Sequence, residues 1–283
     1  MKIKFIYPLL LVLISVLSIN LVTAQQKQKY PEEALGWKLG AQAYTFRLFT
    51  FEQALNKIDS CNLRFVEAYY GQPIGAGSEE KFGPGLSPEG RQLVKKLLND
   101  RGITLYAFGV VNGNNEAEWE RLFAFAKDMG IQVINCEPQE DQLDIVSALC
   151  DKYDIKAGLH NHPEPSIYWQ PETVLKALEG RSKRMGATAD VGHWMRSGLD
   201  PVECLKKLDG RIIHLHFKDL NEFGTKKAHD VHWGTGKLPL EAVIKELKRQ
   251  KFKGMLSAEY EYNWENNAPD VKQSVKNFRA ILR

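Results

Sequence analysis

Eight short apolar runs alternate with segments of helical periodicity along this chain, and this alternation limits its folds more than any other feature. The runs occupy 38–46, 64–71, 103–111, 131–138, 155–163, 185–192, 211–219 and 254–262. The segments with apolar residues every three or four positions are 51–61, 87–102, 115–130, 140–153, 171–180, 200–209, 238–252 and 269–282. Eight strand–helix units predict a single (β/α)8 TIM barrel. A doubly wound open sheet is the second choice, but no GxGxxG sequence follows the first strand.

The first 24 residues differ from the rest of the chain. Lys2 and Lys4 precede a long apolar run, and small residues stand just before Gln25, which together are typical of a signal peptide. A retained membrane anchor is the alternative. We therefore expect a signal peptide at 1–24 and one barrel domain at 25–283. This arrangement predicts an exported, periplasmic protein with no other membrane contact.

The net charge and the cysteines argue against a nucleic-acid-binding protein, a cysteine-based zinc site and a disulfide-bonded protein. The formal net charge is +3, and it falls to +1 when Lys2 and Lys4 are removed. Proteins that bind nucleic acid normally carry a strong basic bias, so no nucleic-acid partner is expected. The four cysteines show no zinc-type spacing, and we expect buried free thiols rather than disulfides.

Two predicted connections are long for the loops of a compact barrel. The segment 71–86 follows the second predicted strand and is rich in glycine and proline, and 220–237 follows the seventh. Long loops inside a compact domain are usually functional. Both should lie over the carboxyl ends of the strands, where barrel enzymes carry their active sites.

Acidic and imidazole side chains stand at the ends of several predicted strands. Brought to one barrel mouth, they would repel one another or remain poorly solvated unless a cation neutralised them. We expect one divalent ion, held by Glu137, Asp190, His216 and Glu259, one from each of four strands. Oxygen and nitrogen ligands of this kind suit Mn²⁺, Mg²⁺, Co²⁺, Fe²⁺ or Zn²⁺ and do not distinguish among them.

Several motifs resemble one known family, the xylose-isomerase-like TIM barrels, which include sugar isomerases and epimerases, inosose dehydratases and apurinic endonucleases. The motifs are CEP (136–138), DVGH (190–193), HLHFKD (214–219) and GTGKLPLEAVIKELKRQKFKGMLSAEYE (234–261). The resemblance covers essentially the whole chain after residue 24. It implies that Asp190, His216 and Glu259 are metal ligands. It also implies that His193 contacts the substrate or supports a ligand.

One position departs from the family's ketose epimerases, in which a glutamate on the fifth strand binds the metal and transfers protons. This chain has LHNHP (159–163), with His160 near that place. The inosose-dehydratase branch resembles it more closely, with a strand-4 glutamate matched by Glu137 and a His-x-His on strand 5. The departure favours a histidine as the general acid or base.

These features predict a metal-dependent enzyme that acts on a sugar or keto-sugar glycoside. A proton next to a carbonyl would be removed and the metal would stabilise the enediolate, giving isomerisation or epimerisation. His162 or His160 and Glu259 are the expected proton carriers, and Lys218 would hold a substrate oxygen. Glu259 acting only as a ligand remains open. β-Elimination by a lyase or dehydratase is the alternative outcome.

Other substrate contacts are expected from His193, Lys218 and Glu67. Trp194 and Trp233 would stack on a sugar face or pack the rim. Apurinic endonucleases use early histidines that 64–71 and 103–111 lack, which argues against a repair enzyme. A barrel that binds carbohydrate without catalysis is a third hypothesis. The sequence leaves the sugar, the metal and the oligomeric state open, and a homo-oligomer is compatible with it.

Overall fold

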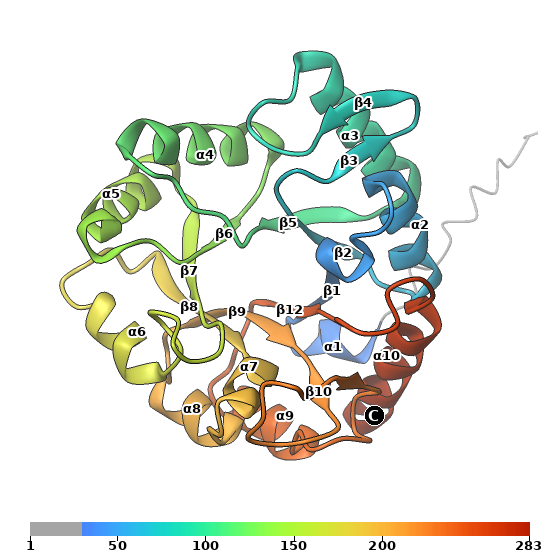
Figure 1. The fold of residues 1–283 in the computed structure, drawn as a ribbon, viewed down its shortest axis with the longest axis vertical. Coiled ribbons are helices and arrows are strands. Elements are labelled where there is room, and N and C mark those ends of the chain that lie inside the picture. The colour runs from blue at the N-terminus through green and yellow to red at the C-terminus, as the bar shows by residue number, and fades with distance from the viewer. Residues whose placement is uncertain (1–29) are drawn as a thin grey trace, which may run out of the picture.

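The computed structural model describes residues 30–283, in which eight parallel strands close into a barrel ringed by helices (Figure 1). The strands lie in the order β1-β12-β9-β8-β7-β6-β5-β2, and β2 closes onto β1. Their bounds are β1 (Lys38–Gln42), β2 (Phe65–Ala68), β5 (Thr104–Phe108), β6 (Val133–Cys136), β7 (Lys156–His160), β8 (Met185–Asp190), β9 (Ile212–Phe217) and β12 (Met255–Ala258). The predicted single (β/α)8 barrel is confirmed.

Helices follow the strands where the periodicity placed them. They are α2 (Phe51–Ser60), α3 (Pro88–Arg101), α4 (Glu116–Met129), α5 (Leu143–Tyr153), α6 (Pro171–Ala177), α8 (Pro201–Lys207), α9 (Leu240–Arg249) and α10 (Ala268–Leu282). Polar side chains satisfy the first backbone amides of several of them, as Thr50 does for α2, Ser87 for α3 and Asp200 for α8. Within 30–283 no helix is both long and apolar enough to cross a membrane. The predicted signal peptide lies outside the described residues.

Local hydrogen bonds end the strands earlier than the sequence predicts. The Gln42 side chain accepts a hydrogen bond from the Tyr44 amide, and Ala43–Phe46 form a 3₁₀ turn instead of continuing β1. Helix α7 (Val191–Arg196) starts directly after β8 because the Asp190 carboxylate caps it. The short helix α1 (Pro31–Ala34) precedes β1. Neither α1 nor α7 is predicted from the sequence.

Both long connections contain small hairpins. The 71–86 loop carries β3 (Pro73–Gly75) and β4 (Ser78–Lys81), which project beside α3 in Figure 1. The 220–237 loop contains β11 (Asp230–Val231), which pairs antiparallel with β10 (Asp219–Leu220) at the start of the loop. The Asp219 carboxylate accepts hydrogen bonds from the amides of Gly234, Gly236 and Leu238 and so fixes this second loop.

The barrel interior is built in layers, as is usual for this fold. An apolar layer at the amino ends of the strands contains Phe65, Tyr106, Val133 and Met255. A polar layer follows, with Glu67, Asn135, Thr188, His214 and Ser257, all of them buried. Above it, at the carboxyl ends, lie His160, Asp190, His216 and Glu259. All four cysteines are buried and free, as predicted.

Gly158 allows the polar layer to close. A Cβ atom at this position would lie 1.9 Å from Thr188 Oγ1 and 2.8 Å from Asn135 Oδ1. Gly158→Ala should therefore disrupt the hydrogen bond between those two side chains and lower the free energy of unfolding by about 1–3 kcal/mol. Urea denaturation measures the change. Gly85→Ala is the control, because a Cβ there meets nothing within 4 Å; equal stability of the two variants would contradict this interpretation.

Candidate metal centre

Four buried side chains converge at the carboxyl ends of four adjacent strands. They are His160 from β7, Asp190 from β8, His216 from β9 and Glu259, which follows β12. One nitrogen or oxygen of each lies within 4.8 Å of the corresponding atoms of the others. His216 Nδ1 lies 2.9 Å from Glu259 Oε2 and 3.9 Å from Asp190 Oδ2, and His160 Nε2 lies 3.7 Å from Asp190 Oδ2.

The two imidazoles are oriented by carboxylates outside the cluster. His216 Nε2 donates a hydrogen bond to Glu67 Oε2 (2.8 Å), and His160 Nδ1 donates to Glu137 Oε1 (2.9 Å). The inward nitrogens, His216 Nδ1 and His160 Nε2, are buried and face carboxylates, but neither forms a well-aligned hydrogen bond within 30–283. A histidine that binds a metal typically gives its other N–H to a carboxylate. The donor set therefore fits a divalent cation.

The charges at the centre are strongly coupled. Burial opposes a charge on His216, but the carboxylates of Glu67 and Glu259 outweigh burial and raise its pKa to about 10. Without an ion, this ring is therefore protonated at neutral pH. A metal would have to displace that proton, so metal binding at this site is coupled to proton release.

Lys218 supplies a second positive charge to the centre. Its fully buried Nζ donates a hydrogen bond to Asp190 Oδ2 (2.6 Å) and another to Glu259 Oε2, and it lies 3.7 Å from Glu261 Oε2. Burial opposes this charge, but the surrounding carboxylates raise the pKa of Lys218 well above its usual value. Lys218 Nζ thus occupies the same carboxylate oxygens that a metal would use. The predicted contact between Lys218 and a substrate remains a prediction.

Glu67 has a different place from the one the sequence suggests. Substrate contact is expected from the sequence, but the Glu67 carboxylate is fully buried in the polar layer below the centre. It accepts hydrogen bonds from Asn135 Nδ2 (2.6 Å), His214 Nε2 (2.7 Å) and Ser257 Oγ (2.9 Å), in addition to that from His216. Burial would raise its pKa, but the two histidines hold the pKa well below its usual range. Glu67 is a positioning residue, and His214 fills the same layer.

Glu137 also lies outside the four-residue cluster. The sequence places Glu137 among the ligands, whereas in the structure the His160 ring lies between Glu137 and Asp190 and takes the fourth position. Glu137 Oε1 also accepts a hydrogen bond from His162 Nδ1. Because the His162 side chain is 48% exposed, this imidazole faces the barrel mouth with its Nε2 free of any hydrogen bond within 30–283. The pair resembles a general base oriented by a carboxylate.

His193 lies beside the cluster, close to its predicted position. Its Nε2 is 3.5 Å from Asp190 Oδ2, and Arg196 donates a hydrogen bond to its Nδ1 (3.1 Å). Burial, together with the positive charge of Lys218, outweighs Asp190 and holds the pKa of His193 well below its usual value. His193 is therefore a neutral imidazole with an N–H directed toward the centre.

The two tryptophans predicted to stack on a sugar belong to the hydrophobic core. Trp194 and Trp233 are each 1% exposed. Trp233 packs edge-on against Phe217, with ring centroids 5.0 Å apart, and against Phe278. Since a sugar needs an accessible ring face, the prediction of substrate contact is wrong for both, and their large apolar area explains their burial.

Two residues of the site were missed from the sequence. Asn161 exchanges two hydrogen bonds with the backbone of Asp190 and so fixes the end of β8. Arg196 connects His193 with Glu261 and Asp230. Asn161 stands between two histidines that the sequence did indicate. Arg196 follows His193 by three residues, so both lie on the same face of α7.

The barrel and this cluster define a TIM-barrel protein with a candidate cation-binding site at the carboxyl ends of its strands. The chain belongs to the xylose isomerase-like TIM barrel family, whose model matches residues 55–281. No curated protein sequence matches the chain.

Solved structures share the fold over most of the chain. A putative uncharacterized protein from Parabacteroides distasonis is 38% identical, with a TM-score of 0.71 over 85% of this chain and 97% of that one. A D-tagatose 3-epimerase-like protein is 19% identical, with a TM-score of 0.67 over 87% and 98%. The IOLI protein with a bound zinc atom is 17% identical, with a TM-score of 0.65 over 87% and 97%.

Proposed function

We propose that the protein is an exported, divalent-metal-dependent enzyme that isomerises or epimerises a sugar or keto-sugar by moving a proton on carbon next to a carbonyl. The two inward nitrogens, His160 Nε2 and His216 Nδ1, support this proposal most strongly, because both are buried and neither forms a well-aligned hydrogen bond within 30–283. They face the carboxylates of Asp190 and Glu259 in a buried site. The family also contains sugar epimerases, among them the structural neighbour resembling D-tagatose 3-epimerase.

A cation held by His160, Asp190, His216 and Glu259 would supply a Lewis acid for the substrate's carbonyl and hydroxyl oxygens. The IOLI structure, which shares this fold, contains a zinc atom, and this supports the proposal of a divalent metal. Other members of the divalent series remain compatible with the donor set.

We assign the proton transfer to two residues, His162 and Glu259, and the stabilisation of negative charge to Lys218. His162 is the most accessible base, since Glu137 fixes its Nδ1 and leaves Nε2 free at the mouth. Glu259, at the edge of the buried cluster, is the second proton carrier. Lys218 Nζ donates hydrogen bonds toward the centre and stabilises negative charge that develops on a substrate oxygen.

A specific observation also supports the alternative reaction, β-elimination. Strand β7, the fifth strand of the barrel, ends at His160, and His162 follows it in the next loop. Neither is a glutamate, so the two-glutamate shuttle of the family's epimerases is incomplete here. An exposed imidazole beside a carboxylate can also protonate a leaving group. A panel of ketoses and 3-keto glycosides distinguishes the two outcomes. An inverted or isomerised sugar supports the main proposal, an unsaturated product supports a lyase, and no product from any member contradicts both.

Export forms part of this proposal and depends on residues 1–24, with Lys2 and Lys4 before the apolar run. Sequencing the N-terminus of the mature protein tests it. A mature chain that starts near Gln25 supports export, and a chain that retains Met1 contradicts cleavage.

Glu67→Gln tests whether the polar layer prepares His216 for a cation. A glutamine keeps the size of the side chain but cannot accept all the hydrogen bonds that converge on the carboxylate. Loss of such an outer partner typically weakens metal binding by about 10–100-fold. Titration of Zn²⁺ against a competing chelator measures the affinity. Glu80→Gln, in the 71–86 loop, is the control, and equal affinities of both variants would contradict this role.

A further inference from the structure

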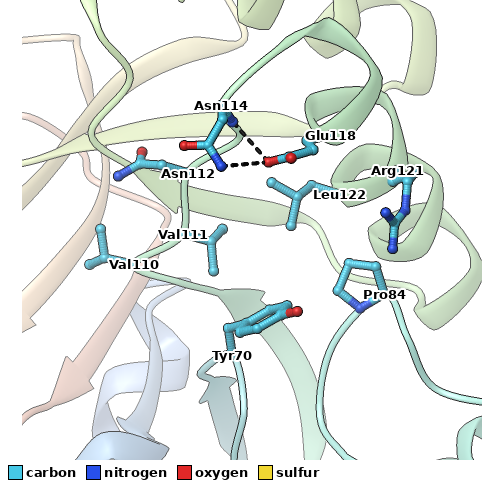
Figure 2. Close-up of a pocket in the computed structure, with 9 residues that line it drawn as sticks. All are labelled: Tyr70, Pro84, Val110, Val111, Asn112, Asn114, Glu118, Arg121 and Leu122. Atoms are coloured by element: carbon cyan, nitrogen blue, oxygen red, sulfur yellow. Dashed lines mark hydrogen bonds between the residues drawn. The ribbon is translucent and has the colours of Figure 1, made fainter.

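A pocket lies near the candidate centre, at the same end of the barrel. It has a volume of about 440 Å³, within the range of small-molecule sites. Residues after β2, in the 71–86 loop, after β5 and on α4 surround it (Figure 2). They are Tyr70, Pro84, Val110, Val111, Asn112, Asn114, Glu118, Arg121 and Leu122.

One residue connects this pocket to the acid–base group. Asn112 lines the pocket, and its Oδ1 accepts a hydrogen bond from the backbone amide of Glu137 (2.8 Å). The Glu137 carboxylate in turn holds His160 and His162. The pocket therefore lies next to the group of Glu137, His160 and His162.

The 71–86 side of the pocket is held in place by contacts within the chain. The Ala76 amide donates to Glu52 Oε2 (2.9 Å), and Gln72 Nε2 donates to the Phe49 carbonyl (3.1 Å). At the end of the loop, Glu80 accepts hydrogen bonds from the amide (2.7 Å) and the hydroxyl (2.8 Å) of Ser87. The pocket is thus largely formed before a ligand enters, which lowers the entropic cost of binding.

The groups around the pocket suit a sugar ring. Tyr70 is 62% exposed, and a Cβ at Gly83 would lie 2.9 Å from its ring, so glycine lets the loop approach the tyrosine closely. Arg121 forms no ion pair or side-chain hydrogen bond with any residue of 30–283, and the Asn112 amide nitrogen has no such bond either. An exposed aromatic ring and free donors that line one pocket match a pyranose, whose C–H face stacks while its hydroxyls accept hydrogen bonds.

We infer that this pocket binds the second, non-reacting sugar ring of a glycoside, while the first ring reaches the centre. The inference rests on the proposed function for its choice of ligand. It gives the 71–86 loop a role in selecting glycosides over free monosaccharides, because a single ring cannot occupy both places.

Binding of unreacted sugars tests the inference without requiring turnover. Isothermal titration and saturation-transfer NMR would compare cellobiose, maltose and lactose with glucose, using the full mature chain in Mg²⁺. At least one disaccharide should bind more tightly than glucose. Tyr70→Ala should weaken the binding of that disaccharide by about three- to tenfold, as expected for loss of an aromatic contact, and leave the affinity for glucose unchanged.

Two variants serve as controls. Tyr70→Phe keeps the ring and should bind like the wild type, and Phe223→Ala removes another aromatic residue, 49% exposed, that does not line the pocket. A wild type that does not prefer any disaccharide, or a Tyr70→Ala variant that binds as well as Phe223→Ala, overturns the inference. Disaccharide binding that depends on Tyr70, without turnover of any keto-sugar, supports the subsite and contradicts the proposed reaction.

Discussion

Asp190→Asn is expected to abolish divalent-ion binding and to reduce turnover by about a thousandfold or more, while the barrel remains folded. The two oxygens of Asp190 have separate partners. Oδ1 accepts the hydrogen bond from the His193 amide (2.8 Å) that caps α7, and asparagine is an equally good capping residue. Oδ2 accepts a hydrogen bond from Lys218 Nζ, where an amide NH₂ would place donors against donors.

The size of the expected loss follows from the charge that is removed. A bound cation contributes several kcal/mol to a transition state with developing negative charge, and each 1.4 kcal/mol corresponds to about tenfold in rate. Inductively coupled plasma mass spectrometry measures the bound metal, and circular dichroism checks the fold. Asp200→Asn makes the same change at the cap of α8, away from the centre, and should alter neither property. Full metal content and full turnover in Asp190→Asn would contradict this account of the site.

Lys218→Met is expected to destabilise the metal-free protein strongly and the metal-loaded protein much less. In the absence of an ion, Lys218 is the buried counter-charge of Asp190 and Glu259. Removing one partner of a buried ion pair costs about 3–5 kcal/mol, which corresponds to a fall in melting temperature of roughly 6 °C or more. A divalent ion would neutralise the same carboxylates without competition from the lysine. Added metal should therefore raise the melting temperature of Lys218→Met more than that of the wild type.

Differential scanning calorimetry with a chelator and then with excess metal tests both parts of this prediction. Lys206→Met is the matched control, because Lys206 pairs with Glu203 on the surface and such pairs contribute little. Two results would contradict the proposed competition between Lys218 and the metal. One is a metal-free Lys218→Met variant with the melting temperature of the wild type, and the other is a smaller rise in melting temperature on adding metal than the wild type shows.

The barrel could be predicted from the sequence because the sequence patterns of its strands and helices are local. Each buried strand is a short apolar run, and each helix that follows has its own apolar face, so every unit is specified within about 30 residues. Asp190, His216 and Glu259 could be predicted as neighbours for a related reason. Each stands near the carboxyl end of a strand, and the barrel brings these ends together.

The heights of side chains inside the barrel could not be predicted in the same way. Strands in a barrel are tilted and staggered, so position along a strand does not give depth. Glu67, opposite Ala107 on β5 and Gln42 on β1, lies below the centre. The sequence predicts Glu137 as the fourth ligand, whereas His160 takes that position in the structure, and the cause is similar. Both residues stand at the ends of neighbouring strands, and only the directions of their side chains decide which one faces Asp190.

Hydrogen exchange at a substrate carbon tests the central claim most directly. The metal-loaded protein is incubated with the panel of ketoses and 3-keto glycosides in D₂O, and mass spectrometry and NMR follow deuterium at the carbon next to the carbonyl. We predict that at least one sugar gains deuterium there, and that a chelator or Asp190→Asn abolishes the gain. Absence of exchange from every sugar, or exchange that persists unchanged after chelation, would contradict a metal-supported proton transfer at this centre.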